Sequence, residues 1–513
     1  MFPTLSIPKR YVFAMMGFLG TLVGYMMRIS LDLTLPHMVM VNQTITAEPR
    51  PYDLYSCPNI IMPNPNTTVA TEIVNPGALE WSASTEKSVS SAFRTAYIMT
   101  QVIGGMVAER SGGKKIMGIA TAILSVATFL IPFASKMIGS TALYVLRFIS
   151  GMASGVTIPV FLSMMSKWAP KDERAFIGSI IFPGALIGYV VGTYLGELIL
   201  ITVGWESVFY TFGVLGIIWC LLWKIMVFST PNEHTTISEK EKSFLNENLP
   251  SLRRTTKYDL DPLPWKAFLT CGALWGTVVG YIGREWALAA LTIQVPQFMK
   301  DVLRLDITTS PYFAYMPYVC MWLAALLFGF ICDIVVKKRY CSVKTARQIF
   351  TSIGAIGAAF SIIMIMYSGC SSVFIVLWMF IGMIVLGAYY SGCMISALDI
   401  APNYAGTMIG VVDNIAINFV LLMPQINNLI ITDALLRQWR LSFWIVAIVL
   451  VVSIAVYFYF IKAEQVWWDD VRSNGYPADW TYDLFQCEGL IAENGESFYK
   501  AKRDSKIKEI NDL

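Results

Sequence analysis

The segment Gly105-Met-Val-Ala-Glu-Arg-Ser-Gly-Gly-Lys-Lys115 returns in outline in the second half of the chain, as Gly329-Phe-Ile-Cys-Asp333 followed by the basic residues Lys337, Lys338 and Arg339. Each copy combines a glycine, an acidic residue and a basic cluster. A second pair keeps the same order, since Ala169-Pro170 with Gly178 is matched by Ala401-Pro402 with Gly410. Short Gly and Pro motifs also recur by chance in helix-rich sequences. Two pairs in the same order nevertheless indicate two related halves.

The composition is that of a membrane protein. Of the 513 residues, 56% are hydrophobic and only 14% are charged, and the mean hydropathy is +0.57. Soluble domains are about 25% charged. Apolar stretches of about twenty residues, the length that crosses a bilayer, recur along the whole chain. These features exclude a soluble enzyme, a secreted disulfide scaffold and a disordered hub, and they predict a polytopic membrane protein.

Hydropathy windows of about nineteen residues predict an all-α polytopic protein with twelve transmembrane helices in two pseudo-symmetric six-helix halves. The predicted helices cover residues 11–41, 88–108, 116–135, 139–167, 175–202, 206–228, 265–298, 311–334, 348–368, 372–400, 404–432 and 437–462. The predicted domains are an N-terminal half at 1–228, a polar cytoplasmic linker at 229–264, a C-terminal half at 265–462 and a cytoplasmic tail at 463–513.

Paired six-helix repeats are typical of alternating-access transporters, whose site lies near the midplane between the halves. Catalytic motifs are missing: the sequence has no P-loop, HExxH or GxSxG pattern. The chain has only two histidines, His37 and His234, and its cysteines form no CxxC, so we expect neither a metal site nor a cofactor. We therefore expect a transporter and not an enzyme.

Both termini are predicted to lie in the cytoplasm. An even number of spans places them on the same side, and Lys and Arg are concentrated in the short segments of that side, which indicates the cytoplasm. The long loop 42–88 on the opposite side contains two N-glycosylation acceptors, Asn42 and Asn66, which are modified only on the lumenal or extracellular face. We expect a multi-pass protein of the plasma membrane or of an endolysosomal or vesicular membrane.

The motif Gly105–Lys115 resembles the helix 2–3 signature of the major facilitator superfamily. The resemblance implies a cytoplasmic charge latch formed by Gly105, Glu109, Arg110, Gly113 and Lys114. Further stretches resemble one branch, the anion/cation symporters that include sialin, the vesicular glutamate transporters and the type I sodium-phosphate cotransporters. These stretches include Tyr97-Ile-Met-Thr-Gln-Val-Ile-Gly-Gly105, Gly155-Val-Thr-Ile-Pro159 and Leu398-Asp-Ile-Ala-Pro-Asn-Tyr-Ala-Gly406.

Arginines inside the predicted spans are candidate substrate ligands. A charge at the bilayer centre costs about 2.5–3.5 kcal/mol, and a guanidinium clasps a carboxylate or phosphate through two parallel bonds. The resemblance implies that Arg28, Arg147 and Arg284 fall at pocket arginines of the vesicular glutamate transporters, and that Tyr97 is a pocket hydroxyl. Arg94 also lies inside a span.

Structural roles for these arginines remain open. Arg28 and Asp32 are four residues apart on one helical face and could neutralise each other. Arg147 could instead donate hydrogen bonds to backbone carbonyls in helix packing. Glu285 could be an ion-pair partner of the neighbouring Arg284.

The coupling ion is not defined by the motifs. Ser150 and Ser154 stand where the family typically carries glutamates, and a serine cannot carry a proton through the cycle. Asp32 and Glu285 are the candidate replacements, while Glu197 and Asp413 lie near helix ends or polar neighbours and are less informative. Sodium coupling could use Asp413, Asn414 and Asn418. Alternatively the membrane potential, worth about 2.3 kcal/mol per charge at 100 mV, could drive an anion alone.

The sequence therefore predicts a secondary active or potential-driven transporter of a small organic anion, a carboxylate, that works by alternating access. One alternative is an inorganic phosphate/sodium cotransporter. An alternative of another class is a transport-inactive receptor or scaffold. The expected partners are the anion, H⁺ or Na⁺, and the lipid bilayer, and the expected state is a monomer without nucleic acid.

Overall fold

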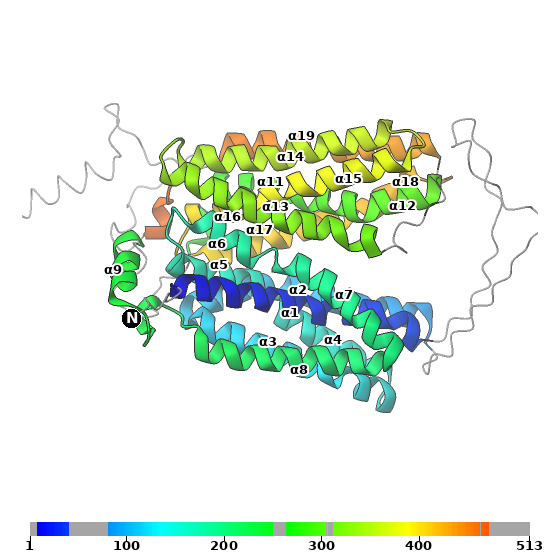
Figure 1. The fold of residues 1–513 in the computed structure, drawn as a ribbon, viewed down its shortest axis with the longest axis horizontal. Coiled ribbons are helices and arrows are strands. Elements are labelled where there is room, and N and C mark those ends of the chain that lie inside the picture. Colours follow the sequence, from blue (N-terminus) through cyan, green and yellow to red (C-terminus); the bar gives the residue numbers. More distant parts are fainter. Residues whose placement is uncertain are drawn as a thin grey trace, which may run out of the picture.

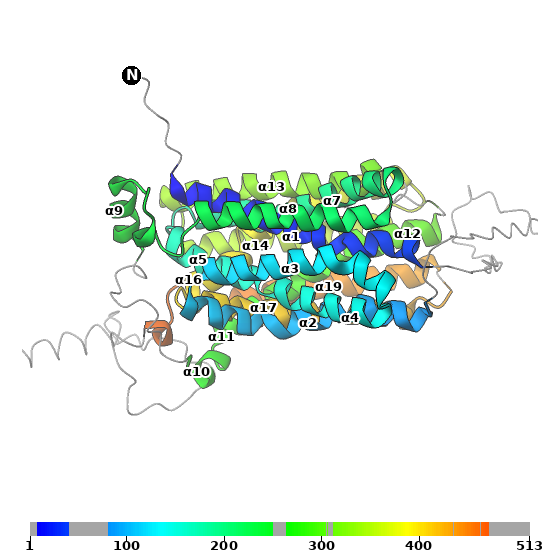
Figure 2. The same ribbon diagram turned by 90° about the horizontal axis from the view of Figure 1, so that it is seen from below.

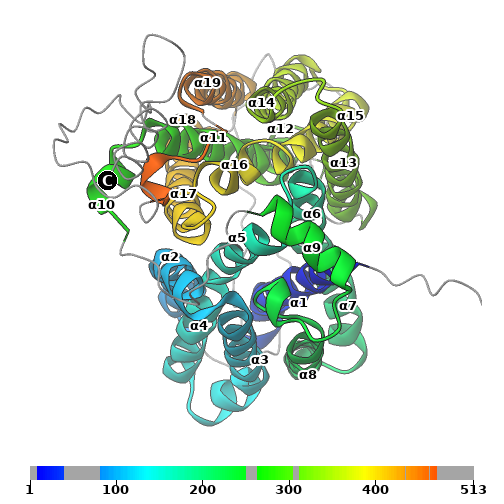
Figure 3. The ribbon, with the colours of Figure 1, turned by 90° about the vertical axis from the view of Figure 1, so that its left-hand side faces the viewer.

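The computed structural model describes residues 8–39, 81–249, 263–303, 305, 311–433, 435–461 and 463–470. These residues form helices and the turns between them, arranged as two bundles side by side (Figure 1). The first bundle holds α1, α3, α4, α7 and α8, and the second holds α11, α13, α14, α15 and α19 (Figure 1). The two bundles meet where α2, α5 and α6 lie against α13, α16 and α17 (Figure 3).

The N-terminal bundle follows the sequence order of its apolar stretches. Its helices are α1 (Lys9–Met38), α2 (Ala83–Ser111), α3 (Gly113–Met137), α4 (Ser140–Gly155), α5 (Thr157–Trp168), α6 (Arg174–Ile181), α7 (Gly184–Thr202) and α8 (Trp205–Met226). Two of the expected spans are each divided into a pair of helices, α4 with α5 and α6 with α7. Pro183 lies at the second break because proline lacks the amide that would continue the helical hydrogen bonds.

The C-terminal bundle contains more irregular turns. Its elements are α10 (Trp265–Leu269), α11 (Gly272–Ala289), the π-helical turn η3 (Ala290–Gln294), α12 (Val295–Val302), α13 (Pro311–Lys337), α14 (Val343–Tyr367), α15 (Ser372–Leu386), the 3-10 turn η5 (Gly387–Tyr390), α16 (Cys393–Ile400), α17 (Ala405–Val420), α18 (Leu422–Ile430) and α19 (Leu436–Phe460). One nearly continuous rod, α11–η3–α12, spans the bundle and turns π-helical in its middle.

The predicted fold class is confirmed. In the described residues, ten helices or helix pairs are long and apolar enough to cross a membrane. The remaining two predicted spans correspond to α2, which carries Arg94, and to the α11–η3–α12 rod, which carries Arg284 and Glu285. Each of the twelve predicted helices thus has a counterpart in the structure. Cys370, between α14 and α15, is disulfide-bonded.

Both ends of the described chain lie at the same end of the molecule as α9 (Glu239–Asn248), which belongs to the linker (Figures 1 and 2). The linker is attached to the first bundle there, because the Glu241 carboxylate accepts the backbone amides of Lys9 and Arg10 at 2.9 and 3.2 Å. The tail begins with the 3-10 turn η6 (Trp467–Asp470). Its Asp469 carboxylate accepts the backbone amides of Asn403 and Tyr404, just before α17, at 3.0 and 3.3 Å.

Candidate transport site

A cavity of about 840 Å³ lies between the two bundles. Both bundles line it, and its charged and phenolic side chains near the middle of the molecule are Arg28, Tyr97, Arg284, Glu285, Tyr390 and Asp413. The lining continues to Asp301 at the end of α12 and to Asn428 and Thr432 at the end of α18. The cavity therefore extends from the centre toward the end of the molecule opposite to α9 (Figure 1).

Arg28 of α1 is surrounded by aromatic rings. Its guanidinium carbon lies 5.4 Å from the ring centre of Tyr25, 5.5 Å from that of Phe93 and 5.3 Å from that of Tyr97. Cation–π contacts of this kind hold a guanidinium in place without using up its N–H donors. The predicted partner Asp32 is exposed and does not line the cavity, and the described side chains of Arg28 and Asp32 form no ion pair. The donors of Arg28 thus remain available to a ligand.

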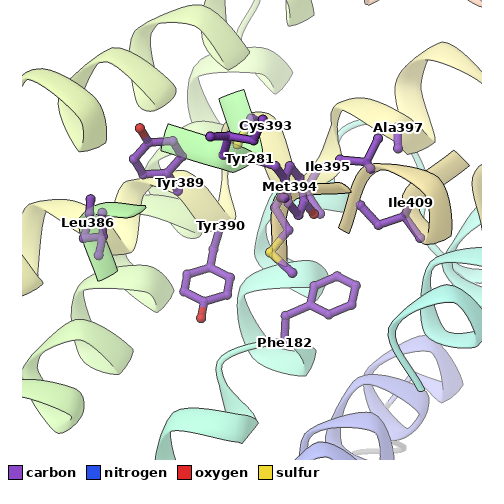
Figure 4. Close-up of a cluster of buried hydrophobic side chains, with 14 of the residues drawn as sticks. Phe182, Tyr281, Leu386, Tyr389, Tyr390, Cys393, Met394, Ile395, Ala397 and Ile409 are labelled. Atoms are coloured by element: carbon purple, nitrogen blue, oxygen red, sulfur yellow. The ribbon is translucent and has the colours of Figure 1, made fainter. Parts of the chain in front are cut away.

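Arg284 of α11 faces the same cavity from the other half. It forms an ion pair with Glu285, donates a hydrogen bond from Nη2 to the Tyr390 hydroxyl at 3.1 Å, and lies 5.0 Å above the Tyr390 ring. Tyr389 and Tyr390 point to opposite sides of η5, and only Tyr390 lines the cavity (Figure 4). The Nε atom of Arg284 is buried without a hydrogen-bond partner among the described residues.

Arg147 is placed differently from the other two arginines. Its side chain is 2% exposed and does not line the cavity. The Nη1 atom donates to the Arg28 carbonyl at 3.3 Å, and the guanidinium lies 4.8 Å above the Phe93 ring. This geometry matches the packing role that the sequence left open, since Arg147 donates to the backbone of Arg28 from outside the cavity lining. Arg94, in contrast, is exposed and lines the cavity.

Asp413 is less informative than Asp32 and Glu285 in the sequence, yet this residue lines the cavity between the two halves. Its carboxylate lines the cavity and accepts a hydrogen bond from the Gln101 amide of the opposite half at 2.5 Å. One residue further on, the Asn414 amide donates to the Ile98 carbonyl at 2.5 Å. Of the two serines at the family's glutamate positions, Ser154 lines the cavity and Ser150 donates to the Leu146 carbonyl at 2.8 Å.

The end of the molecule near α9 is closed by two contacts between the halves. We call the first the α2–α17 seam, formed by residues 98–109 against 406–414. There the Glu109 carboxylate accepts from the backbone amide of Thr407 at 2.7 Å and from its hydroxyl at 2.6 Å. A side chain at Gly105 would overlap the backbone of Gly406. The two helices are therefore in backbone contact, and Glu109 caps the first turn of α17.

The second contact, the α13–α6 seam, is formed by residues 329–333 against 175–179. The Asp333 carboxylate accepts from the backbone amides of Ala175 at 3.2 Å and Phe176 at 2.8 Å. An added Cβ at Gly329 would lie 2.5 Å from the Ser179 hydroxyl. The two copies of the motif thus have the same structural role, because the acidic residue of each copy caps a helix of the opposite half.

A buried cluster lies beside the α13–α6 seam. Asp399 of α16 accepts from Arg174 of the first half at 2.9 Å and from Arg347 of its own half at 2.8 Å. All three side chains are 5% exposed or less. The sequence does not show that Arg174 and Arg347 share a partner, because Asp399 lies 225 and 52 positions away from them.

The predicted latch residues have separate roles. Among the five, Gly105 and Glu109 make the contact between the halves. Lys114 stays within its own half, with Nζ 4.0 Å from the Phe228 ring centre, and Gly113 packs against Met164. Arg110 is exposed. The predicted glycosylation residues Asn42 and Asn66 lie outside the described residues.

The comparisons with known proteins agree with this architecture. Two six-helix halves around a central cavity define the class of alternating-access membrane transporters. A solved structure of a proton:xylose symporter has a TM-score of 0.63 with this chain at 15% identity, covering 90% of this chain and 98% of the symporter chain. That likeness concerns the fold alone. The sequence profile described as Major Facilitator Superfamily matches residues 17–423.

Relatives narrow the family further. Sialin of Homo sapiens is 32% identical over 462 residues, which cover 90% of this chain and 90% of sialin. A Drosophila melanogaster protein named "Putative inorganic phosphate cotransporter" is 28% identical over 91% of this chain and 88% of its own length. Vesicular glutamate transporter 3 of Danio rerio is 26% identical over 91% of this chain and 75% of its own. The chain therefore belongs to the Major Facilitator Superfamily, in the branch that includes sialin, as its motifs predicted.

Proposed function

We propose that this protein moves a small organic anion, a carboxylate, across the membrane by alternating access. One observation carries the proposal: Arg28 and Arg284, two cationic side chains from opposite halves, line the same cavity. An anion bound between them contacts both halves, so its binding favours a state in which the halves come together. This is the property that an alternating-access site requires.

The shape of the site favours an organic anion over phosphate. The cavity volume falls within the range of about 300–1,000 Å³ that is common for small-molecule sites. Tyr25, Tyr97, Tyr189 and Tyr318 line it beside the arginines. Aromatic rings offer apolar surface that a carbon skeleton can cover and that phosphate cannot use. Phosphate is the second candidate, because one relative's name specifies inorganic phosphate.

The driving force is either an ion gradient or the membrane potential. For an anion, about 2.3 kcal/mol per charge is available at 100 mV. H⁺ and Na⁺ are the candidate coupling ions, although Ser150 and Ser154 leave helix α4 without a carboxylate to carry a proton. The retained arginines and the cavity support transport over the alternative of a receptor or scaffold.

We further propose that the end bearing α9, the N-terminus and the tail faces the cytoplasm. The cavity then faces the lumen or the exterior. Treatment of the protein from Asn-glycosylating cells with a glycosidase should lower its apparent mass, because loop 42–88 contains Asn42 and Asn66. An unchanged mass in such cells, with both acceptors intact, would contradict this orientation.

The test uses purified protein in liposomes and radiolabelled lactate, glutamate, glucuronate and inorganic phosphate. We expect saturable uptake of at least one carboxylate. Arg284→Ala should abolish that uptake. Arg284→Lys should retain only part of it, because an ammonium keeps the charge but cannot form the paired bonds of a guanidinium. Arg437→Ala, at an exposed position outside the cavity, is the control. Uptake by Arg284→Ala at the wild-type rate would refute the assignment.

A further inference from the structure

We propose that Asp413 is the proton-binding site that couples transport to a pH gradient, and that Gln101 transmits its protonation to the α2–α17 seam. The inference rests on the proposed anion transport. It assigns the coupling role to a residue on α17 instead of Asp32 or Glu285, which the sequence suggested.

The surroundings of Asp413 suit a group that binds and releases a proton. Its side chain is 3% exposed, so protein surrounds it, yet it lines the cavity and can be reached from there. Its hydrogen-bond partner in the described residues is the neutral amide of Gln101. Gln101 is fully buried, and its Oε1 atom has no hydrogen-bond partner in the described part of the chain. A protonated Asp413 could donate to that oxygen after the amide turns over, which gives Oε1 a donor.

The charged groups around Asp413 do not neutralise it directly. Arg284 and Glu285 face it from α11, and Arg28 faces it from α1. The phenols of Tyr97 and Tyr281 lie nearby on α2 and α11. None of these cations forms an ion pair with Asp413 in the described structure. On the other helices packed against α17, Lys167 of α5 and Asp399 of α16 lie toward the end where α17 begins.

Glu285 is the weaker candidate because it already has a charged partner. Its carboxylate is ion-paired with Arg284. A proton on Glu285 would leave the buried guanidinium without its counter-charge, which is strongly unfavourable inside a protein. Asp32 is exposed and does not line the cavity. A proton bound there would not report on the presence of substrate.

The charges in the centre of the cavity also favour a proton on Asp413. The lining of the cavity carries three arginines, Arg28, Arg94 and Arg284, against four carboxylates, Glu285, Asp301, Asp413 and Asp433, so it holds one net negative charge when all of these groups are ionised and no substrate is present. A monovalent anion therefore adds one uncompensated negative charge to a buried site, and a single proton removes it. Asp413 is the acid whose protonation does not break an ion pair. The complex of protein, anion and one proton then keeps the net charge that the lining has without substrate.

Protonation would also act on the contact between the halves. A hydrogen bond to an ionised acceptor is roughly twice as strong as a neutral one. The Gln101–Asp413 bond crosses the α2–α17 seam where that seam meets the cavity. A proton entering from the cavity thus weakens the seam from its inner side. Proton binding and the opening of the closed end are linked through one hydrogen bond.

The experiment separates coupling from transport itself. Asp413→Asn keeps a polar side chain of the same shape but cannot bind a proton. One coupled proton supports about tenfold accumulation for each pH unit of gradient. We expect wild-type liposomes to accumulate the transported carboxylate to that degree, and Asp413→Asn liposomes to show no accumulation while exchange of internal for external substrate continues. The control Asp172→Asn, on an exposed loop residue, should accumulate like the wild type. Accumulation by Asp413→Asn at the wild-type ratio would overturn the proposal.

If none of the four probes is transported, the proposed function is refuted. Proton binding by Asp413 can then still be tested by a measurement without substrate. Infrared spectra of the purified protein are recorded while the pH is lowered. We expect the carbonyl stretch of a buried protonated carboxyl group to grow in during the titration, to be missing in Asp413→Asn and to persist in Asp172→Asn. An unchanged band in Asp413→Asn would show that another acid binds the proton.

Discussion

The α2–α17 seam and the α13–α6 seam close the same end of the molecule in the same way, yet their interiors differ. Glu109 and Asp333 each place a carboxylate on the first amides of a helix in the other half. Deeper in, α2 and α17 touch backbone to backbone and share the polar pair Gln101–Asp413. The α13–α6 seam is instead lined by side chains, such as the rings of Phe176 and Phe330, whose centres lie 6.0 Å apart.

This difference shows which part of the internal repeat has been kept. The acidic caps act on backbone amides, which every helix start offers, so the cap can be repeated with any sequence around it. The cavity side of each seam has to contact a substrate that lacks the symmetry of the protein. On that side the two seams are formed by different residues, and we expect them to tolerate substitutions differently.

The largest expected effect comes from filling the glycines. A methyl group at Gly105 would lie 2.4 Å from the backbone of Gly406, which can move only with the whole of α17, whereas one at Gly329 would lie 2.5 and 2.7 Å from the Oγ and Cβ atoms of the Ser179 side chain. We expect Gly105→Ala to cost the closed state about 3 kcal/mol, roughly a hundredfold in its population, and Gly329→Ala about 1 kcal/mol. Uptake rates in liposomes would measure both. Equal losses would show that the two seams are equally tight.

An intermediate effect is expected from the caps. Glu109→Gln and Asp333→Asn each retain an acceptor oxygen but lose the charge, so each should weaken the closed end by about 1 kcal/mol. Because the two sites are separate, the double variant should show about the sum. The readout is the labelling rate of Ser163→Cys by a water-soluble thiol reagent, since Ser163 is 3% exposed beside Gly406. A double variant labelled no faster than either single one would contradict this additivity.

The smallest effect is expected at the opposite end, where Tyr315 of α13 donates to Glu197 of α7 at 3.0 Å. Tyr315→Phe removes a partly buried bond between the halves, worth about 1 kcal/mol or less. Its loss should favour the state that is open to the cavity side and change the apparent KM by about fivefold or less. Tyr194→Phe, at an exposed ring of α7, the helix that carries Glu197, serves as the control. A loss of uptake as large as that of Gly105→Ala would contradict this ranking.

Most of the fold could be predicted from the sequence, because apolar length alone places a helix in a bilayer. The interruptions could not. Nothing in the hydropathy of residues 272–302 predicts the π-helical turn at Ala290–Gln294, since its cause is packing between helices. The break at Pro183 does have a local signal, the proline itself. It divides the helix predicted at 175–202 into α6 and α7, which together cover nearly the same residues.

The site was only partly predictable. Arg28, Arg284 and Tyr97 line the cavity, and the cost of burying a charge was enough to single out the two arginines. The same reasoning cannot distinguish Arg147, which is buried in packing. Asp413 was underrated because its partner Gln101 is 312 positions away. Contacts between the halves depend on how two bundles meet, and helical periodicity within one bundle carries no information on that.

Two carboxylates from different sources meet at the start of α17. Glu109 belongs to the opposite half and must leave when the closed end opens, but Asp469 comes from the tail and remains bound to the amides of Asn403 and Tyr404. At α6 the acid that precedes the helix, Glu173, is instead engaged by the side chain of Arg10 at 2.6 Å. We expect the halves to part more readily at α17, since Asp469 lies in the same half as α17 and can keep a counter-charge at this helix start. The rate of the cycle should then depend on a tail segment that lies outside the cavity lining.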